Sequence, residues 1–336
     1  MATKKGYNIR KNVFMNYTRE DTTFVIPDGV VAIGAGAFKN CKHLIDIQIP
    51  DSVTSICTEA FSGCSSLESI EIPDSVTYIG PGAFAHCTGL TCVNLPSGVT
   101  KIFSHTFYLC SELKRVNIPD SVTEIDSYAF ACCYSMENVA IPAGVVSLDK
   151  SAFRSCTQLT GITVDERNHR YRSSGNCLIE TKRNAIISGC GSSVIPEDDS
   201  VCRIDSYAFE NCYALTNIKI PRNITSMGNF AFHGCKNLLR VEIADGIRDI
   251  PSYTFARCAR LRTVELPDGI THIGDHAFSD CTSLQTIRIP ETVTVIDGYY
   301  AFANCEQLVI ETTEGSRAAI YAAENNMSVY SGGVVV

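Results

Sequence analysis

The sequence LESIEIPDSVTYIGPGAFAHC, residues 67–87, decides the fold. It contains an alternation of apolar and polar residues that ends at Pro73, a second short β-prone segment, a turn of small residues and the motif Ala-Phe-x-x-Cys. Proline lacks the amide donor that a sheet ladder requires, so Pro73 ends the first strand and turns the chain. The same order of features recurs along the chain, and it predicts that this segment is one unit of an internal repeat.

Phenylalanine and cysteine mark each repeat. The period is 23 residues from Phe38 to Phe153 and again from Phe209 to Phe278, with one extra residue before Phe302. Eleven cysteines lie three residues after a phenylalanine, in the pairs Phe38/Cys41, Phe61/Cys64, Phe84/Cys87, Phe107/Cys110, Phe130/Cys133, Phe153/Cys156, Phe209/Cys212, Phe232/Cys235, Phe255/Cys258, Phe278/Cys281 and Phe302/Cys305. A fixed period of about 20 to 50 residues is typical of solenoids.

A unit of 23 residues is too short to enclose a core of its own. Each repeat must therefore pack its Leu, Ile, Val and Phe side chains against the repeats before and after it. We expect a β-rich solenoid of eleven repeats with a parallel β-ladder along one face and β-hairpin insertions.

The repeat resembles a known family. The segments LESIEIPDSVTYIGPGAFAHC and LQTIRIPETVTVIDGYYAFANC, residues 67–87 and 284–305, are similar to the BspA-like (Treponema-type) leucine-rich repeat, and the similarity extends from about residue 21 to about residue 330. The resemblance implies a curved solenoid, a right-handed coil with a C-terminal capping helix, used for adhesion or other protein contacts and without catalytic residues. Residues 315–330 resemble the helix that usually closes this solenoid.

The repeat is interrupted once, at residues 165–195. This island aligns without a gap to the N-terminus, with Tyr171 opposite Tyr7, Leu178 opposite Phe14 and Arg183 opposite Arg19. We predict that each copy forms a β-hairpin. In the island, CLIE and AIIS are the two strands and TKRN is the turn between them. We therefore predict one continuous solenoid, divided into an N-terminal capping hairpin (1–25), a first block of six repeats (26–164), the inserted hairpin (165–195), a second block of five repeats (196–312) and a C-terminal cap and tail (313–336).

Composition excludes several classes of partner. The chain of 336 residues is 45% hydrophobic and 19% charged, which is typical of a folded protein. Its 28 basic and 36 acidic residues give a net charge of −8, which argues against nucleic acid or an anionic membrane as a partner. No apolar run approaches the roughly 18 residues of a spanning helix, so we predict no membrane insertion, and a monomer is the default state.

The compartment stays open. The start MATKKGYNIRKN has no apolar stretch typical of a signal peptide. With many unpaired cysteines, a native N-terminus of this kind favours the cytoplasm. If a signal peptide has been removed, we expect the chain at the cell surface or secreted.

The cysteines have two interpretations. Free cysteine is among the most buried residue types, so the ladder of eleven is read as reduced core. Alternatively, Cys177, Cys190 and Cys202, near His169, could form a thiol- or metal-dependent site in the 165–202 island. Zinc sites commonly use Cys-x2-Cys pairs, which this sequence lacks. No nucleophile, phosphate-loop or paired-acid motif stands apart from the repeat, so we predict no catalytic residue, metal or cofactor.

The first strand of each repeat offers a candidate binding face. Side chains alternate along a strand, so the third and fifth residues of L-x-x-I-x-I point away from the core. The middle of this stripe is rich in amides and arginine. The residues predicted to bind a partner there are Arg115, Asn117, Asn138, Asn217, Lys219 and Arg240. The alternative is a solvated sheet face without a binding role.

A second candidate surface lies two residues before each phenylalanine of the repeat. Aromatic residues dominate this column in the second block, and we expect their rings to stack on the outer ridge of the coil. The rings either shield the neighbouring turns or form a platform for a sugar or an arginine-bearing partner. The candidate platform residues are Tyr128, Tyr207, Tyr253 and Tyr300.

Three functions follow from this pattern. The first is a non-catalytic protein that binds a protein or glycan through its solenoid surface. The second is a structural spacer or scaffold without a single site. The third, the thiol- or metal-dependent site of the island, requires an accessible cysteine.

Overall fold

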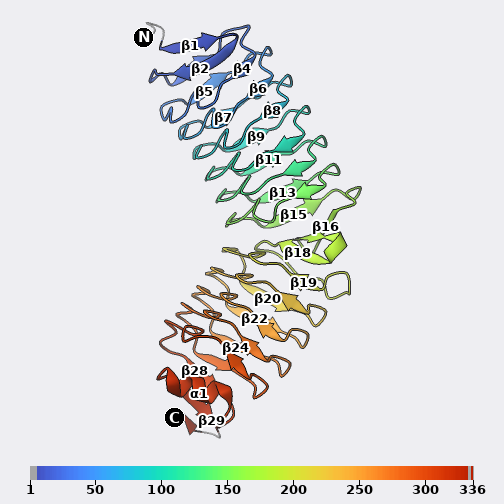
Figure 1. The fold of residues 1–336 in the computed structure, drawn as a ribbon, viewed down its shortest axis with the longest axis vertical. Helices are drawn as coiled ribbons and strands as arrows, with labels where there is room; N and C mark the ends of the chain where they lie inside the picture. Colours follow the sequence, from blue (N-terminus) through green and yellow to red (C-terminus); the bar gives the residue numbers. More distant parts are fainter. Residues whose placement is uncertain (1–5, 332–333, 336) are drawn as a thin grey trace. The chain divides into compact units, whose positions relative to one another are not determined.

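The computed structural model describes residues 6–331 and 334–335. The chain forms two compact units, Met1–Arg172 and Ser173–Val336. Within each unit, Figure 1 shows a stack of similar repeats, each contributing short strands joined by tight turns. The predicted parallel β-solenoid is thereby confirmed. The finer division into five segments remains a prediction.

Each repeat of unit 1 contributes two short strands. The first strands of these repeats are β3 (Thr23–Val25), β5 (Asp46–Gln48), β7 (Ser69–Ile70), β9 (Cys92–Asn94), β11 (Arg115–Asn117), β13 (Asn138–Ile141) and β15 (Gly161–Val164). The second strands are β4 (Ala32–Ile33), β6 (Ser55–Ile56), β8 (Tyr78–Ile79), β10 (Lys101–Ile102), β12 (Glu124–Ile125) and β14 (Ser147–Leu148). The antiparallel strands β1 (Tyr7–Arg10) and β2 (Val13–Tyr17) precede them.

Unit 2 repeats the arrangement. Its first strands are β20 (Asn217–Ile220), β22 (Arg240–Ile243), β24 (Thr263–Glu265), β26 (Thr286–Arg288) and β28 (Val309–Glu311). Its second strands are β19 (Arg203–Ile204), β21 (Ser226–Met227), β23 (Asp249–Ile250), β25 (His272–Ile273) and β27 (Val295–Ile296). Before them come β17 (Cys177–Glu180), the 3-10 helix η1 (Thr181–Arg183) and β18 (Ala185–Ser188), while β16 (Tyr171–Ser174) spans the division between the units.

Successive repeats pair in parallel, with equivalent positions opposite each other. In the first strands, Arg115 lies opposite Cys92 and Asn217 lies opposite Arg240. The third side of each repeat contains no strand, yet its amides also bond to the next repeat, as Phe61 N does to Ala83 O at 2.8 Å. A single repeat is too short to satisfy its own backbone hydrogen-bonding groups. Hydrogen bonds to the neighbouring repeats on all three sides satisfy them instead.

The phenylalanine column forms the interior. Phe130 is fully buried between Phe107 and Phe153, with ring centroids 5.3 and 5.4 Å away and nearly parallel planes. In unit 2 the stack begins at Phe209, and a Cβ on Gly189 would collide with its ring. Glycine is therefore required where the second stack starts, because only a bare backbone leaves room for the ring.

The cysteine ladder is buried beside the phenylalanines and has a role that the sequence did not indicate. Each Sγ of the inner ladder except that of Cys212 donates to the phenylalanine carbonyl oxygen of the preceding repeat, as Cys64 does to Phe38 at 3.1 Å and Cys281 to Phe255 at 3.1 Å. Cys212, in the first repeat of the second block, donates instead to Gly189 O at 3.6 Å. Cys41, at the first repeat, is only partly buried. Each of these phenylalanine oxygens also accepts from the amide of the cysteine three residues later, as Phe38 O does from Cys41 N at 3.1 Å, so the thiol adds a second hydrogen bond that links successive repeats in the core.

Two residues of most repeats adopt the left-handed backbone conformation, the exceptions being the repeats of Phe153 and Phe302, where Ser151 and Tyr300 have no positive φ. One lies two residues before the phenylalanine, as in Tyr207 with φ 66°, and the other directly before the cysteine, as in Asn40 with φ 61°. The second column includes Gly63, Asn211 and Gly234, which tolerate this conformation best. These residues turn the chain sharply on its third side.

The hairpin prediction is confirmed in the island, whereas at the N-terminus other strands form the hairpin. The island does contain the antiparallel pair β17 and β18, with Ile179 opposite Ile186. At the N-terminus, however, the hairpin is β1 with β2, and the segment that corresponds to β18 overlaps β3, which pairs in parallel with β5. Asn184 closes the island turn with φ 49°, whereas Glu20 stands at the equivalent N-terminal position and has no positive φ. Asparagine tolerates the left-handed conformation much better than glutamate does.

The predicted closing helix is present as α1 (Arg317–Glu324). The Ser316 side chain caps it by accepting from Ala319 N at 3.2 Å. Ala318, Tyr321 and Ala322 are buried, and the Tyr321 ring meets Phe302, the last ring of the stack, edge to face. The strand β29 (Ser328–Ser331) then continues the ladder beside β28, and β30 (Val334–Val335) pairs antiparallel with β29.

Candidate functional site

The strand face of unit 1, formed by the outward side chains of β9, β11, β13 and β15, is the first candidate surface. Arg115, Asn117 and Asn138 are all exposed there, as the strand alternation predicted. They line a shallow hollow of about 530 Å³ together with Asn94 and Thr163. Asn138 leans over Gly161, because a Cβ on that glycine would collide with its side-chain oxygen.

Arg115 carries the only charge among the outward side chains of these four strands. The others are Cys92, Asn94, Asn117, Asn138, Ala140, Gly161 and Thr163. Within the described part of the chain, the Arg115 guanidinium makes no ion pair. A guanidinium offers five donors in a rigid fork, and carboxylates match its geometry. This face therefore presents one unused cation among hydrogen-bonding amides.

The strand face of unit 2, formed by the outward side chains of β20, β22, β24, β26 and β28, has a different character. Asn217, Lys219 and Arg240 line a hollow of about 380 Å³. Lys219 is already paired with Glu197 at 2.7 Å, whereas Arg240 has no ion pair among the described residues. The structure thus gathers the six predicted residues into two groups of three, one in each unit.

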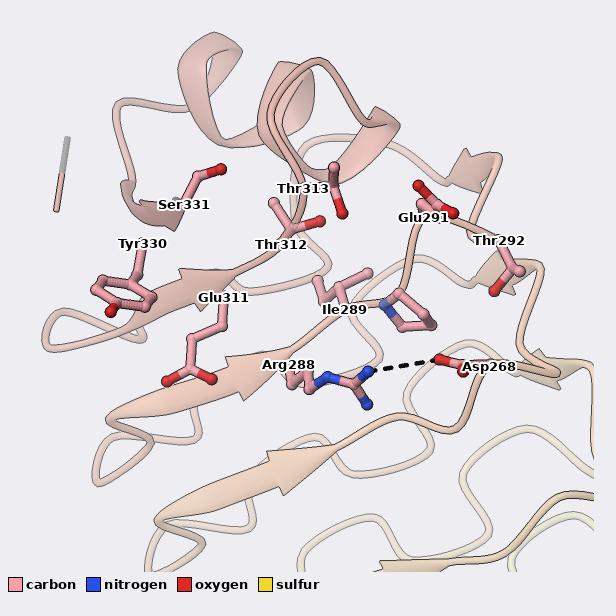
Figure 2. A pocket seen from close by; sticks show the side chains of 11 residues that line it. Asp268, Arg288, Ile289, Glu291, Thr292, Glu311, Thr312, Thr313, Tyr330 and Ser331 are labelled. Atoms are coloured by element: carbon pink, nitrogen blue, oxygen red, sulfur yellow. Dashed lines mark ion pairs between the residues drawn. The ribbon is translucent and has the colours of Figure 1, made fainter. Parts of the chain in front are cut away.

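Sequence reasoning missed a third hollow at the end of the unit 2 strand face. Figure 2 shows Arg288, Glu311 and Tyr330 lining it from three neighbouring strands. Its volume is about 510 Å³, and Arg288 is held there by Glu265 at 3.2 Å and Asp268 at 3.6 Å. The signal for Glu311 and Tyr330 was weak, because their strands lack the proline that ends the first strand of most other repeats.

The ridge, defined as the column two residues before each phenylalanine of the repeat, contains the predicted stack of rings. In unit 2 it runs through Tyr207, Phe230, Tyr253, His276 and Tyr300, with centroids of neighbouring rings 4.5 to 5.0 Å apart. All except Tyr300, which is 56% exposed, are half-buried. Each ring stacks face to face on its neighbours, so mainly the ring edges are exposed to solvent. This arrangement favours the shielding role over a platform, because a sugar ring would need a free aromatic face.

Tyr128 lies on the ridge of unit 1. It is half-buried, and its ring lies tilted by 31° against the His105 ring, with centroids 5.2 Å apart. Tyr128 belongs to unit 1, whereas the five-ring stack belongs to unit 2. The platform role of Tyr128, Tyr207, Tyr253 and Tyr300 remains a prediction.

The island cysteines do not converge on a site. Cys177 and Cys190 are buried, and burial raises the pKa of the Cys177 thiol to about 12. Cys190 lies against Asn176 O at 3.4 Å, and Cys202 is only partly buried. Such a raised pKa disfavours the thiolate that nucleophilic chemistry requires. Among the described residues, no group of three or more His, Cys, Asp and Glu side chains could hold a metal ion.

In residues 6–331 and 334–335, no helix is long and apolar enough to cross a bilayer.

Comparison with known proteins gives consistent matches along the chain. The family model for the BspA type leucine-rich repeat region, which has six copies of the repeat, matches residues 7–125, 89–189 and 188–309. A leucine rich cell surface protein from Faecalibacterium prausnitzii A2-165 is 32% identical over 95% of this chain and 96% of its own, with a TM-score of 0.74. No curated protein matches the chain.

Two further solved structures share the fold. A leucine-rich repeat protein from Bacteroides ovatus ATCC 8483 is 25% identical over 97% of this chain and 90% of its own, with a TM-score of 0.65. The pneumococcal vaccine antigen PcpA is 18% identical over 98% of this chain and 97% of its own, with a TM-score of 0.68. At this identity, PcpA supports the fold alone.

Proposed function

The chain belongs to the BspA-type leucine-rich repeat family, and from that premise we propose that it is a non-catalytic module that binds a protein partner through its strand faces. The partner presents carboxylate and peptide groups to the exposed arginines and amides. The similar protein from Faecalibacterium prausnitzii is described as a cell surface protein. Adhesion-type binding at a cell surface is therefore part of the proposal.

One observation carries the proposal. Arg115 and Arg240 are exposed on the strand faces without an ion pair in the described part of the chain, whereas Lys219 and Arg288 on the same kind of face are paired. Arginine is enriched in protein interfaces and in their energetic hot spots. Arg115 also lies among asparagine side chains, which can donate to and accept from a peptide backbone.

The non-catalytic part of the proposal is supported by the chemistry of the inner cysteines. The inner cysteines are buried, and burial raises the pKa of Cys110, Cys156 and Cys235 to about 12. A thiol that stays protonated and out of contact with solvent is structural rather than reactive. The spacer function remains the competing outcome.

The test begins with a pull-down by the intact chain from extracts of its own source, followed by identification and purification of the captured protein. The dissociation constant is then measured for the wild type and for the double variant R115E/R240E. A matched control reverses two exposed lysines away from the strand faces, K150E/K182E. We expect the R115E/R240E variant to bind at least about tenfold more weakly, as expected for a lost hydrogen bond to a charged group.

Two results would contradict the proposal. Equal affinity of the wild type and the R115E/R240E variant would remove the strand faces from the interface. Failure of the wild type to capture any partner that binds after purification would support the spacer function instead.

A further inference from the structure

A hollow on the ridge side of unit 1 is separate from the strand faces. We call it the ridge hollow. It has a volume of about 670 Å³, and its walls include Lys39, Lys42, His86, His105 and Tyr108. Small-molecule sites commonly have volumes of about 300 to 1,000 Å³. The ridge hollow is therefore large enough for a small ligand or a segment of a chain-like one.

The hollow exists because the ring stack of the ridge stops in unit 1. One face of the His105 ring is covered by Tyr128, with centroids 5.2 Å apart. The next ridge position is Gly82, which has no side chain, so no stacked ring follows His105 there; among the described residues, Tyr108 in the wall of the hollow meets the His105 ring edge to face at 5.2 Å. In unit 2 every ridge position carries a ring, and each inner ring has a neighbour on both faces.

The floor of the hollow consists of small residues in successive repeats, including Gly63, Gly82 and Ala85. A Cβ on Gly82 would lie 3.4 Å from Glu59 Cγ, which is ordinary contact. Its φ of 62° is close to the φ values of 56° at Tyr128 and 59° at Tyr253, the equivalent ridge positions. The backbone at Gly82 thus has the geometry that carries a tyrosine elsewhere in this chain.

The charge of the hollow differs from that of the whole chain. The chain carries a net charge of −8, yet the hollow is lined by two lysines and two histidines against the single carboxylate of Glu59. Lys39 pairs with Glu59 at 2.6 Å. Lys42 is exposed and has no ion pair among the described residues. One ammonium group is therefore available for an anionic ligand.

We propose that the ridge hollow binds an acidic saccharide, a sugar ring that carries a carboxylate or a sulfate group. The apolar C–H face of the sugar packs on the His105 ring on the side of Gly82. The acidic group pairs with Lys42, and the imidazoles of His86 and His105 together with the Tyr108 hydroxyl bond to hydroxyl groups of the sugar. A nucleic acid fits less well, because one free ammonium group in a chain of net charge −8 provides no extended basic surface.

The test is calorimetric titration of the intact chain with three hexasaccharides. A heparin-derived hexasaccharide supplies sulfate groups, a hyaluronan hexasaccharide supplies carboxylates, and maltohexaose is the neutral probe. We expect at least one acidic probe to bind and maltohexaose to bind at least about tenfold more weakly, as expected for a lost hydrogen bond to a charged group. The acidic probe that binds better identifies the acidic group.

Two variants place the binding in the hollow. G82Y extends the ring stack over His105 and fills the hollow, and K42E reverses its free charge. Both should weaken binding of the acidic probe at least about tenfold, whereas K114E, the same charge change outside the hollow, should retain the wild-type affinity. If G82Y fails to fold by circular dichroism, H105A removes the ring face instead and carries the same expectation.

The proposal is overturned if no acidic probe binds, if maltohexaose binds equally well, or if G82Y (or H105A in its place) and K42E bind as the wild type does. The variant R115E/R240E should bind the saccharide normally. Loss of binding in that variant would instead place the saccharide on the strand faces and contradict the ridge hollow.

Discussion

Replacement of Phe130 by alanine should destabilise unit 1 by about 4 kcal/mol. The ring is fully buried, and burial of a phenylalanine side chain stabilises the folded state by about 1.5 to 3 kcal/mol. The variant also loses two parallel ring contacts, to Phe107 at 5.3 Å and to Phe153 at 5.4 Å, each contributing about 0.5 to 1.5 kcal/mol. The sum agrees with the roughly 3 to 5 kcal/mol measured for large truncations in other cores.

Urea unfolding followed by circular dichroism measures this effect through the transition midpoint and slope. S127A, a change at a partly exposed residue of the same repeat, should stay within about 0.5 kcal/mol of the wild type. F153A should cost about 1 kcal/mol less than F130A, because Phe153 is 6% exposed and stacks on one ring among the described contacts. A change below about 1 kcal/mol in F130A would refute the phenylalanine column as the structural spine.

Three further predictions concern the thiols, the ridge and the island. Burial raises the pKa of Cys110 and Cys235 from 9.0 to about 12, so the stability that these protonated thiols contribute should be full below pH 9 and fall as the pH rises toward 12. The loss should reach up to about 1.4 kcal/mol per pH unit for each thiol. Melting curves of C110A and C235A should show a flatter loss of stability at alkaline pH than the wild type, and an unchanged loss would contradict the burial of these thiols. Y253A should cost about 1 to 3 kcal/mol in urea unfolding because Tyr253 stacks on both faces, and Y300A should cost clearly less; equal costs would argue against stacking as the source. N168A should cost about 2 to 3 kcal/mol, because the buried Asn168 amide donates to two carbonyl oxygens and accepts from two backbone amides; a neutral result in the same assay would show that water replaces these bonds.

The fold was predictable because one short pattern sets the period, the core and the strand alternation together. The spacing of Phe130 and Cys133 recurs in every repeat, and both columns lie in the core as expected. The left-handed positions were missed, although Asn40 and Gly63, directly before their cysteines, are residues that favour this conformation. Their signal was present in residue type but is weaker than hydrophobic periodicity.

The island was less predictable because its structure depends on contacts far apart in sequence. The Arg183 side chain bonds to both carboxylate oxygens of Asp205 at 2.8 and 2.9 Å, across 22 residues. Asn168 satisfies the corner carbonyl oxygens of Pro142 and Val145, a role that a local pattern does not reveal. Sequence reasoning therefore found the island pair β17 and β18, but not that β16 lies beside β17 as the counterpart of the N-terminal pair β1 and β2.

The candidate site was predictable in its exposed residues and not in its hollows. Alternation along the strands correctly placed Arg115 and Arg240 in solvent. Whether an exposed charge is free depends on distant residues, as Lys219 and Glu197 show. The ridge hollow depends on the absence of a ring at Gly82, and an absent side chain leaves little signal in one sequence.

The proposed strand-face binding is tested most directly by the reactivity of Cys92. Its thiol is exposed on the unit 1 strand face, opposite Arg115 in the ladder, whereas most other cysteines are buried. Maleimide labelling, quantified by mass spectrometry, compares the free chain with the chain saturated by its purified protein partner. The account predicts that the partner slows labelling of Cys92 and leaves the partly buried Cys202, off this face, unchanged. Equal labelling of Cys92 in the free and the bound chain would contradict binding at this face.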